Sequence, residues 1–139
     1  MNSKPRKVNF IIVDDSELDC FIAEKLIKHS GIGNSTKSFL QASEALNYIQ
    51  NSSDLGEDTI NMILLDILMP MMSGIEFVEA FEALPAEIQE KYIIVAFTSS
   101  MNKKEMNRMK SFNSVKHLFN KPLSPEVLQP LLHDYNLIS

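Results

Sequence analysis

Five short runs that read as β-strands, each followed by a segment with helical spacing, constrain the fold of this 139-residue chain more than any other feature. Three of the runs, the first, third and fourth, are strongly apolar, as strands of a buried sheet are. The runs are Val8 to Val13, Ser35 to Leu40 (the weakest), Ile60 to Leu65, Tyr92 to Phe97 and Val115 to Phe119. Repeated strand-helix alternation predicts an α/β fold with three layers, in which helices cover both faces of a mostly parallel sheet.

Five segments with helical spacing lie between and after these runs. They are Ser16 to Ser30, Ala42 to Gln50, Ile75 to Leu84, Asn102 to Phe112 and Pro125 to Tyr135. In the first segment, four apolar residues share one helical face: Leu18, Phe21, Ile22 and Leu26. In the third segment, Ile75, Val78 and Phe81 are expected to face inward.

Capping signals support two of these helices. Ser73, followed three residues later by Glu76, is typical of a capping box at the start of the third helix. Ser124 and Pro125 place a favourable N-cap and then a proline at the first helical position of the fifth helix. Both signals agree with the apolar period, so they strengthen the predicted helix starts.

Composition and charge indicate the class of protein. The length suits a single domain, expected to span residues 1–139 with a core of about 7–135, and hydrophobic residues make up 45% of the chain. The net charge of −5 argues against a nucleic-acid surface. The single Cys20 cannot form an internal disulfide, which suits a reducing compartment. No segment reaches the ~18 apolar residues of a membrane span. We therefore expect a cytoplasmic protein without a membrane partner.

Polar residues follow directly after four of the predicted strands. Asp14 and Asp15 follow the first strand, Asp66 the third, Thr98 the fourth, and Lys121 comes one residue beyond the fifth. Parallel strands joined by right-handed crossovers all point the same way, so their carboxyl ends meet at one edge of the sheet. Open α/β sheets bind their ligands at that edge. We therefore expect three carboxylates, a hydroxyl and an ammonium group to share one rim.

The chemistry of such a rim favours phosphoryl transfer. Three crowded carboxylates repel one another unless a cation lies among them. Oxygen ligands with room for water suit Mg²⁺, which Asp14 and Asp15 are expected to hold. Asp66 is the candidate nucleophile, because carboxylates form aspartyl-phosphate intermediates. Lys121 would neutralise charge on the transferring oxygens, and Thr98 would donate a hydrogen bond to one of them.

Each of these residues taken alone has an ordinary structural interpretation. Asp14, Asp15 and Asp66 would each be a strand-end or helix N-cap carboxylate. Thr98 would belong to an ordinary loop, and Lys121 would be a surface charge. The functional interpretation depends on the joint order Asp-Asp, Asp, Thr, Lys at the ends of successive strands.

With these motifs in order, the sequence resembles the receiver domains of bacterial two-component response regulators, in particular single-domain, chemotaxis-regulator-like receivers. The matching stretches are IIVDDSE, MILLDILMPMMSG, VAFTSS and FNKPL. The resemblance runs from about Val8 to the last helix. It implies a five-stranded parallel sheet in the flavodoxin-like order 2-1-3-4-5 with five helices. Because the chain ends soon after its fifth helix, we expect a stand-alone regulator whose output is a partner protein.

The resemblance also implies a role for each site residue. Asp66 is similar to the phosphoacceptor, which receives its phosphoryl group from a sensor histidine kinase or a histidine phosphotransfer protein. Thr98 is similar to the switch hydroxyl, and Lys121 to the phosphate-binding lysine, with a cis peptide bond before Pro122. The domain would catalyse only its own phosphoryl transfer and dephosphorylation, as a monomer or weak dimer, rather than act as an enzyme.

The metal ligands are implied in the same way. Asp15 resembles the carboxylate that binds Mg²⁺ directly, and Asp14 its neighbour that acts largely through water. Asp66 and the backbone carbonyl of Leu68 complete the expected protein ligands.

Two positions depart from the commonest family pattern. Leu118 stands where many receivers have an aromatic residue, and strand alternation aims the flanking His117 and Phe119 at the opposite face of the sheet. An aromatic switch is therefore not predicted. The second departure is Leu68, which is frequently a polar residue in relatives.

Three alternatives compete with the receiver interpretation. A haloacid-dehalogenase-type phosphatase also uses a strand-end Asp, but it carries a second Asp two residues later, where this chain has Leu68. A nucleotide- or flavin-binding module would need a phosphate-cradling loop after the first strand, whereas Asp14 and Asp15 repel phosphate in the absence of a metal. A degenerate receiver would bind partners without phosphorylation, but all five expected site residues are present.

Overall fold

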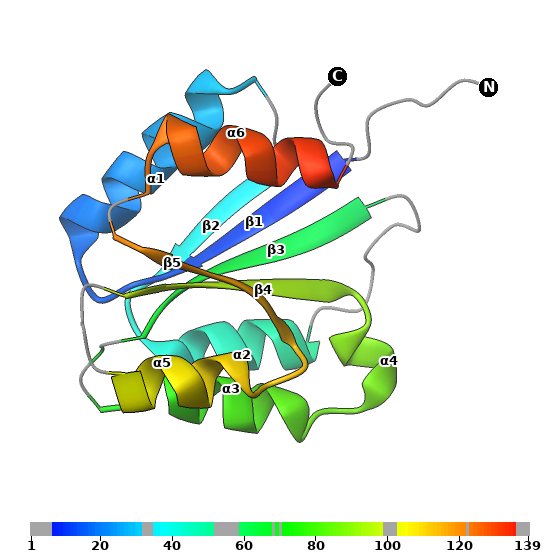
Figure 1. Cartoon of the computed structure of the whole chain (residues 1–139). Helices are drawn as coiled ribbons and strands as arrows, with labels where there is room; N and C mark the ends of the chain where they lie inside the picture. Colours follow the sequence, from blue (N-terminus) through cyan, green and yellow to red (C-terminus); the bar gives the residue numbers. More distant parts are fainter. Residues whose placement is uncertain are drawn as a thin grey trace.

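The computed structural model describes residues 7–31, 35–51, 59–67, 69, 71–98, 103–121 and 123–135. Within these residues the chain forms one parallel sheet of five strands in the order β2-β1-β3-β4-β5 (Figure 1). The strands are β1 (Lys7–Val13), β2 (Ser35–Phe39), β3 (Thr59–Asp66), β4 (Tyr92–Thr98) and β5 (Val115–Asn120). The predicted α/β class, parallel sheet and flavodoxin-like strand order are confirmed.

The same residues form six helices, one more than predicted. They are α1 (Glu17–His29), α2 (Ala42–Asn51), α3 (Gly74–Glu82), α4 (Ala86–Gln89), α5 (Lys103–Lys110) and α6 (Pro125–Asp134). The additional helix is α4, which has four residues and follows Pro85. A single turn is too short to show a helical period, so the sequence pattern did not reveal it. Among the described residues, no helix has the length and apolarity needed to cross a bilayer.

The helices cover the sheet in two layers. Helices α1 and α6 lie on one face, and α2, α3 and α5 lie on the other (Figure 1). Alternate residues of each central strand therefore serve two separate apolar clusters. In β1, Phe10 and Ile12 belong to the cluster under α1 and α6, here called the α1/α6 cluster. Ile11 and Val13 belong to the cluster under the other helices, called the α2/α3/α5 cluster.

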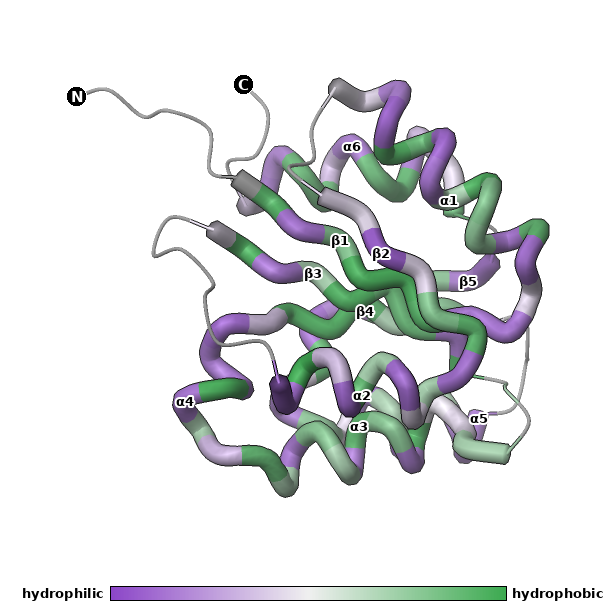
Figure 2. The backbone as a smooth tube through the Cα atoms, turned by 180° about the vertical axis from the view of Figure 1, so that it is seen from behind, coloured by the Kyte–Doolittle hydropathy of each residue, from purple (hydrophilic) through white to green (hydrophobic). Residues whose placement is uncertain are grey.

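The central strand β3 is buried from Ile60 to its last residue, Asp66. A strand that is covered on both faces is apolar in almost every position, and Figure 2 shows the hydrophobic residues concentrated in the central strands. One polar residue within this run, Asn61, accepts a hydrogen bond from Asn9 and donates one to the carbonyl of Lys91. The continuous apolar pattern of β3 therefore brings Asp66 to the edge of the sheet in a buried position.

Helix α1 packs through a different face from the one that its apolar period indicated. The buried residues are Cys20, Ala23 and Ile27, and Leu26 is only partly buried. Leu18, Phe21 and Ile22 are exposed, with relative exposures of 65%, 56% and 40%. The buried face of α1 therefore runs through Cys20, Ala23 and Ile27, and the larger apolar residues near the start of the helix face outward.

Helix α3 agrees better with the sequence pattern. Val78 and Phe81 are buried and Ile75 packs against the α2/α3/α5 cluster, as predicted, together with the buried Phe77. The predicted capping box is confirmed, because the backbone N–H of Glu76 donates to the Ser73 hydroxyl and its carboxylate accepts from the Ser73 N–H.

Candidate functional site

The carboxyl ends of four strands meet at one edge of the sheet, as the alternation predicted. Asp66 is the last residue of β3 and Thr98 the last of β4. Asp14 follows β1 directly, and Lys121 follows β5. Backbone hydrogen bonds hold these ends together, because the N–H of Lys121 donates to the carbonyl of Thr98 at 2.9 Å and the N–H after Asp66 donates to the carbonyl of Phe97 at 3.0 Å.

Three carboxylates form a group that can hold a cation. Asp14, Asp15 and Asp66 each offer one oxygen, and the three oxygens lie within 4.8 Å of one another. Asp14 and Asp66 are buried, whereas Asp15 is exposed. A set of oxygen donors with one side open to water is the kind of site that Mg²⁺ prefers. These three residues therefore fit the predicted metal.

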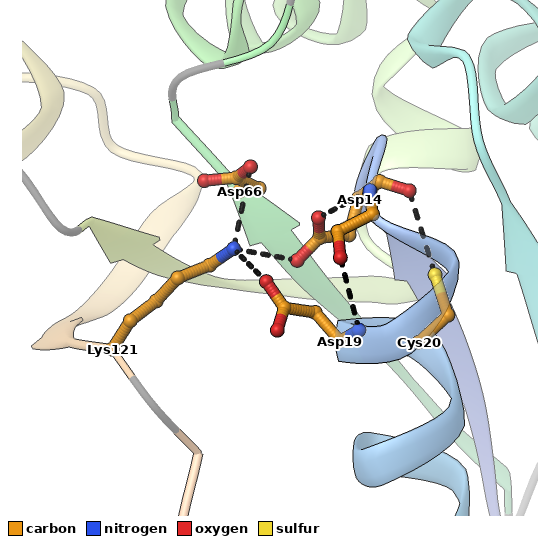
Figure 3. Close-up of polar contacts among 6 residues, drawn as sticks. Asp14, Asp19, Cys20, Asp66 and Lys121 are labelled. Carbon is orange, nitrogen blue, oxygen red and sulfur yellow. Dashed lines mark hydrogen bonds and ion pairs between the residues drawn. The ribbon is translucent and has the colours of Figure 1, made fainter.

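Lys121 brings a positive charge into this group. Its Nζ donates to Asp14 Oδ2 at 2.8 Å and lies 3.4 Å from Asp66 Oδ2 (Figure 3). Partial burial by itself lowers the pKa of Lys121, but the hydrogen bonds to carboxylates and the charge of Asp66 outweigh it and raise that pKa above its usual value. The side chain therefore stays protonated at neutral pH.

A fourth carboxylate, which the sequence analysis did not select, also binds Lys121. The Nζ atom donates to Asp19 Oδ2 at 2.8 Å, and Asp19 lies in the first turn of α1 (Figure 3). The only sequence signal is an acidic residue at the start of a helix, and such residues are common because they interact well with the helix dipole. Asp19 was therefore indistinguishable from an ordinary first-turn carboxylate.

The segment after β1 is fixed through Asp14. The N–H of Ser16 donates to Asp14 Oδ1 at 3.0 Å, and the thiol of Cys20 donates to the Asp14 carbonyl at 3.4 Å. Burial, followed by the charge of Asp14, raises the pKa of Cys20 to about 11, so the thiol stays neutral. Cys20 is thus a small buried residue that helps to anchor the loop carrying the acidic pair.

Gly74 fixes the backbone behind Asp66. Its N–H donates to the carbonyl of Ile67 at 2.8 Å. A Cβ atom at this position would lie 2.6 Å from Ile67 Cα and 2.8 Å from the Asp66 carbonyl oxygen, closer than any side chain can approach backbone atoms. Only glycine lets α3 begin against the residues that carry the candidate nucleophile. The Ser-Gly pair that follows the apolar run is the sequence signal for this contact.

A cavity of about 200 Å³ adjoins the charged group. Its apolar lining comes from α1, from the sheet and from the segment between β5 and α6: Ile12, Ile22, Ala23, Leu64, Phe97 and Leu123. Its charged lining residues are Asp14, Asp19, Asp66 and Lys121. The charged group therefore lies beside unfilled space in the α1/α6 layer.

Strand β5 confirms the predicted side-chain directions. Leu118 pairs with Ala96 and packs in the α2/α3/α5 cluster, whereas Phe119 packs in the α1/α6 cluster. The rings of His117 and Phe119 are stacked with centroids 5.9 Å apart. These two aromatic rings therefore lie on the opposite face from Leu118. Two further expectations, the Leu68 carbonyl ligand and the cis bond before Pro122, fall outside the described residues.

With this geometry established, comparison with known proteins gives the family. The family model of the response regulator receiver domain matches residues 10–133 of this chain. This chain belongs to the response regulator receiver domain family. The family that the sequence motifs resemble is thereby confirmed, and the phosphatase and cofactor-binding alternatives lose support. Receiver domains are signalling domains that interact with histidine kinases or phosphotransfer proteins and with output proteins, and they bind Mg²⁺ through an acidic pocket.

Solved structures support the same family. A response regulator receiver protein from Dyadobacter fermentans is similar, with 29% identity and a TM-score of 0.79, over 92% of this chain and 97% of that one. A two-component response regulator from Cytophaga hutchinsonii has 18% identity and a TM-score of 0.80, over 95% and 98%. The Vibrio cholerae chemotaxis protein CheY4 has 23% identity and a TM-score of 0.70, over 93% and 98%. The last two similarities show the fold alone.

Proposed function

We propose that this receiver accepts a phosphoryl group on Asp66 in a reaction that depends on Mg²⁺, and that it signals by binding a partner protein. The observation that supports this most is the position of the Lys121 ammonium, 2.8 Å from Asp14 and 3.4 Å from Asp66 in a group of three cation-binding carboxylates. A lone buried carboxylate destabilises the fold. Beside an ammonium group and a metal site its charge is compensated, and the same positive charges can stabilise the negative charge of a phosphoryl group.

The proposed reaction assigns one task to each residue. A carboxylate oxygen of Asp66 attacks the phosphorus of a phosphohistidine, so that an O–P bond forms while the N–P bond breaks and the imidazole nitrogen keeps the electron pair. Lys121 stabilises negative charge on the phosphoryl oxygens, and the Thr98 hydroxyl donates a hydrogen bond to one of them. Mg²⁺ held by Asp14, Asp15, Asp66 and the Leu68 carbonyl would supply further charge neutralisation.

The proposed donor is a sensor histidine kinase or a histidine phosphotransfer protein. Its histidine must approach Asp66 at the carboxyl edge of the sheet, next to the start of α1. Three apolar residues are exposed there: Leu18, Phe21 and Ile22. Exposed apolar residues of this kind suit a protein partner. We further propose that residues 1–139 contain one receiver domain and that the protein is cytoplasmic, monomeric or weakly dimeric, with no membrane or nucleic-acid partner.

Intact mass measurement after incubation with acetyl phosphate and Mg²⁺ tests the proposal. We expect one added phosphoryl group on the parent protein and none on Asp66→Ala. Asp134→Ala, which removes an exposed carboxylate from the last turn of α6, is the matched control and should be labelled like the parent. Circular dichroism shows whether Asp66→Ala keeps its fold. Equal labelling of the parent and Asp66→Ala would contradict the proposal.

A further inference from the structure

We propose that Asp19 is a positioning residue that competes with the phosphoryl group for Lys121, and that it thereby limits how far Asp66 becomes phosphorylated. This inference rests on the proposed function, because it concerns the availability of the same lysine. The observation behind it is that Lys121 is shared between two parts of the molecule. One of its carboxylate partners belongs to the three-carboxylate group, and another belongs to α1.

The distances show that Asp19 is a full partner of the lysine. Lys121 Nζ lies 2.8 Å from Asp19 Oδ2 and 2.8 Å from Asp14 Oδ2, but 3.4 Å from Asp66 Oδ2. In the view of Figure 3, Asp19 and Asp66 lie on opposite sides of the ammonium group. Lys121 Nζ donates hydrogen bonds to Asp14 and Asp19 and forms a longer ion pair with Asp66, so three carboxylates share its single positive charge. Phosphoryl oxygens on Asp66 therefore compete with Asp14 and Asp19 for the ammonium group.

Asp19 is the partner whose release costs least. Its side chain is 40% exposed, whereas that of Asp14 is 9% exposed. A carboxylate that loses its lysine in contact with water is rehydrated, but a buried one is left as an uncompensated charge. Asp14 also belongs to the group that fits a cation, and Asp19 does not. The phosphorylated form is therefore expected to keep the Lys121–Asp14 pair and to break the Lys121–Asp19 pair.

The backbone keeps Asp19 close to the site after the lysine has moved. Its N–H donates to the hydroxyl of the N-cap residue Ser16 at 3.2 Å, and Ser16 is held in turn by its own bond to Asp14. Asp19 also lines the same cavity as Asp66. Its negative charge therefore faces the added negative charge of a phosphoryl group at short range, which disfavours the phosphorylated form.

This arrangement predicts opposite effects on two ligands. Removal of the Asp19 charge frees Lys121 and reduces repulsion, so phosphoryl transfer at saturating Mg²⁺ becomes faster and the phosphorylated form lasts longer. The same change removes negative charge from the neighbourhood of the metal site, so Mg²⁺ binds more weakly. If Asp19 only supported the fold, its substitution would lower both the rate of phosphoryl transfer and the affinity for Mg²⁺.

The test is Asp19→Asn, which removes the charge while keeping the size of the side chain and the backbone N–H at the cap. Glu17→Gln is the matched control, because Glu17 is exposed, lies in the same helical turn and carries the same charge. Three quantities are measured for each protein. They are the rate of labelling by acetyl phosphate at saturating Mg²⁺, the half-life of the label after donor removal, and the dissociation constant of Mg²⁺ alone from calorimetry.

For Asp19→Asn we expect labelling about three- to tenfold faster, a longer half-life, and Mg²⁺ binding weakened by about two- to fivefold. Glu17→Gln should change each quantity by less than about twofold. Labelling of Asp19→Asn at the parental rate or more slowly, at saturating Mg²⁺, overturns the proposal for Asp19 alone. A parent protein that takes up no label overturns the proposed function, and the proposal for Asp19 with it.

Discussion

The two layers of helices cover the same sheet, yet they are built differently. Under α2, α3 and α5 the core contains large side chains with no exposed area, among them Phe77, Phe81 and Ile49. Under α1 the helix contributes the small Cys20 and Ala23 together with Ile27, and a cavity of about 200 Å³ lies beside the charged group. An open groove of about 450 Å³ also lies at the surface of the α2/α3/α5 layer, beside Phe39 and Tyr48, but it contains none of the charged site residues. The α2/α3/α5 layer is called the filled layer here for its buried core, and the α1/α6 layer has its pocket where Asp66 and Lys121 lie.

This difference indicates which layer supports the fold and which serves the site. Protein interiors are normally close-packed, and unfilled space costs stability. The unfilled space here adjoins the charged group, and the exposed apolar residues of α1 lie above the same face of the sheet. Departures from good packing are expected mainly at functional sites. We infer that the α1/α6 layer is less closely packed beside the charged group, and that this keeps the group accessible.

The largest effect is expected from truncation of the filled layer. Phe81→Ala should lower the free energy of unfolding by about 3–5 kcal/mol, because it removes a buried ring that also packs edge-on against Tyr92. Phe21→Ala makes the same chemical change on the exposed face of α1 and should cost less than about 0.5 kcal/mol. Urea unfolding followed by circular dichroism measures both values. Equal losses would contradict the comparison.

A smaller effect is expected from enlarging one alanine in each layer. Ala45 lies in α2 with no exposed area, so Ala45→Val should cost about 1–3 kcal/mol through overpacking. Ala23 lies in α1 and lines the cavity, so an added pair of methyl groups has space to occupy. Ala23→Val should therefore cost less than about 1 kcal/mol, most of it from the lower helix propensity of valine. Urea unfolding measures both free energies of unfolding. If Ala23→Val loses as much stability as Ala45→Val, the α1/α6 layer is packed as tightly around Ala23 as the other layer is around Ala45.

The smallest effect is expected from the metal. At a Mg²⁺ concentration ten times its dissociation constant, the parent should gain about 1.4 kcal/mol of stability by linkage. Asp15→Asn should lose most of that gain, because Asp15 belongs to the three-carboxylate group and is its exposed member. Phe81→Ala, in the filled layer, should keep the full gain. An undiminished gain in Asp15→Asn would remove Asp15 from the proposed ligands.

Topology explains why so much of the site was predictable. Asp14, Asp66, Thr98 and Lys121 lie at the ends of strands that the apolar pattern identifies, and parallel strands necessarily bring these ends together. Knowledge of the strands was therefore sufficient to group residues up to 107 positions apart in the chain. No pairwise contact had to be guessed.

The features of the fold and the site that could not be predicted depend on how a helix is rotated about its axis and on how closely two backbone segments approach each other. The apolar period of α1 predicted that Leu18, Phe21 and Ile22 face the sheet. In the structure these residues are exposed, and the face with Cys20 and Ala23 packs on the sheet instead. That rotation also directs Asp19 toward Lys121, which a first-turn acid does not reveal by itself. The contact of Gly74 with the backbone of Asp66 and the single turn of α4 leave equally weak signals in the sequence.

The central claim is that Asp66 itself carries the phosphoryl group, and chemical mapping of the label tests it most directly. Protein labelled with acetyl phosphate and Mg²⁺ is treated with borohydride, which reduces an aspartyl phosphate to homoserine, and is then digested for peptide mass analysis. We predict homoserine at position 66 and unchanged aspartate at positions 14, 15 and 19. Homoserine at any of those three positions, or a labelled protein with no homoserine at position 66, would contradict the account.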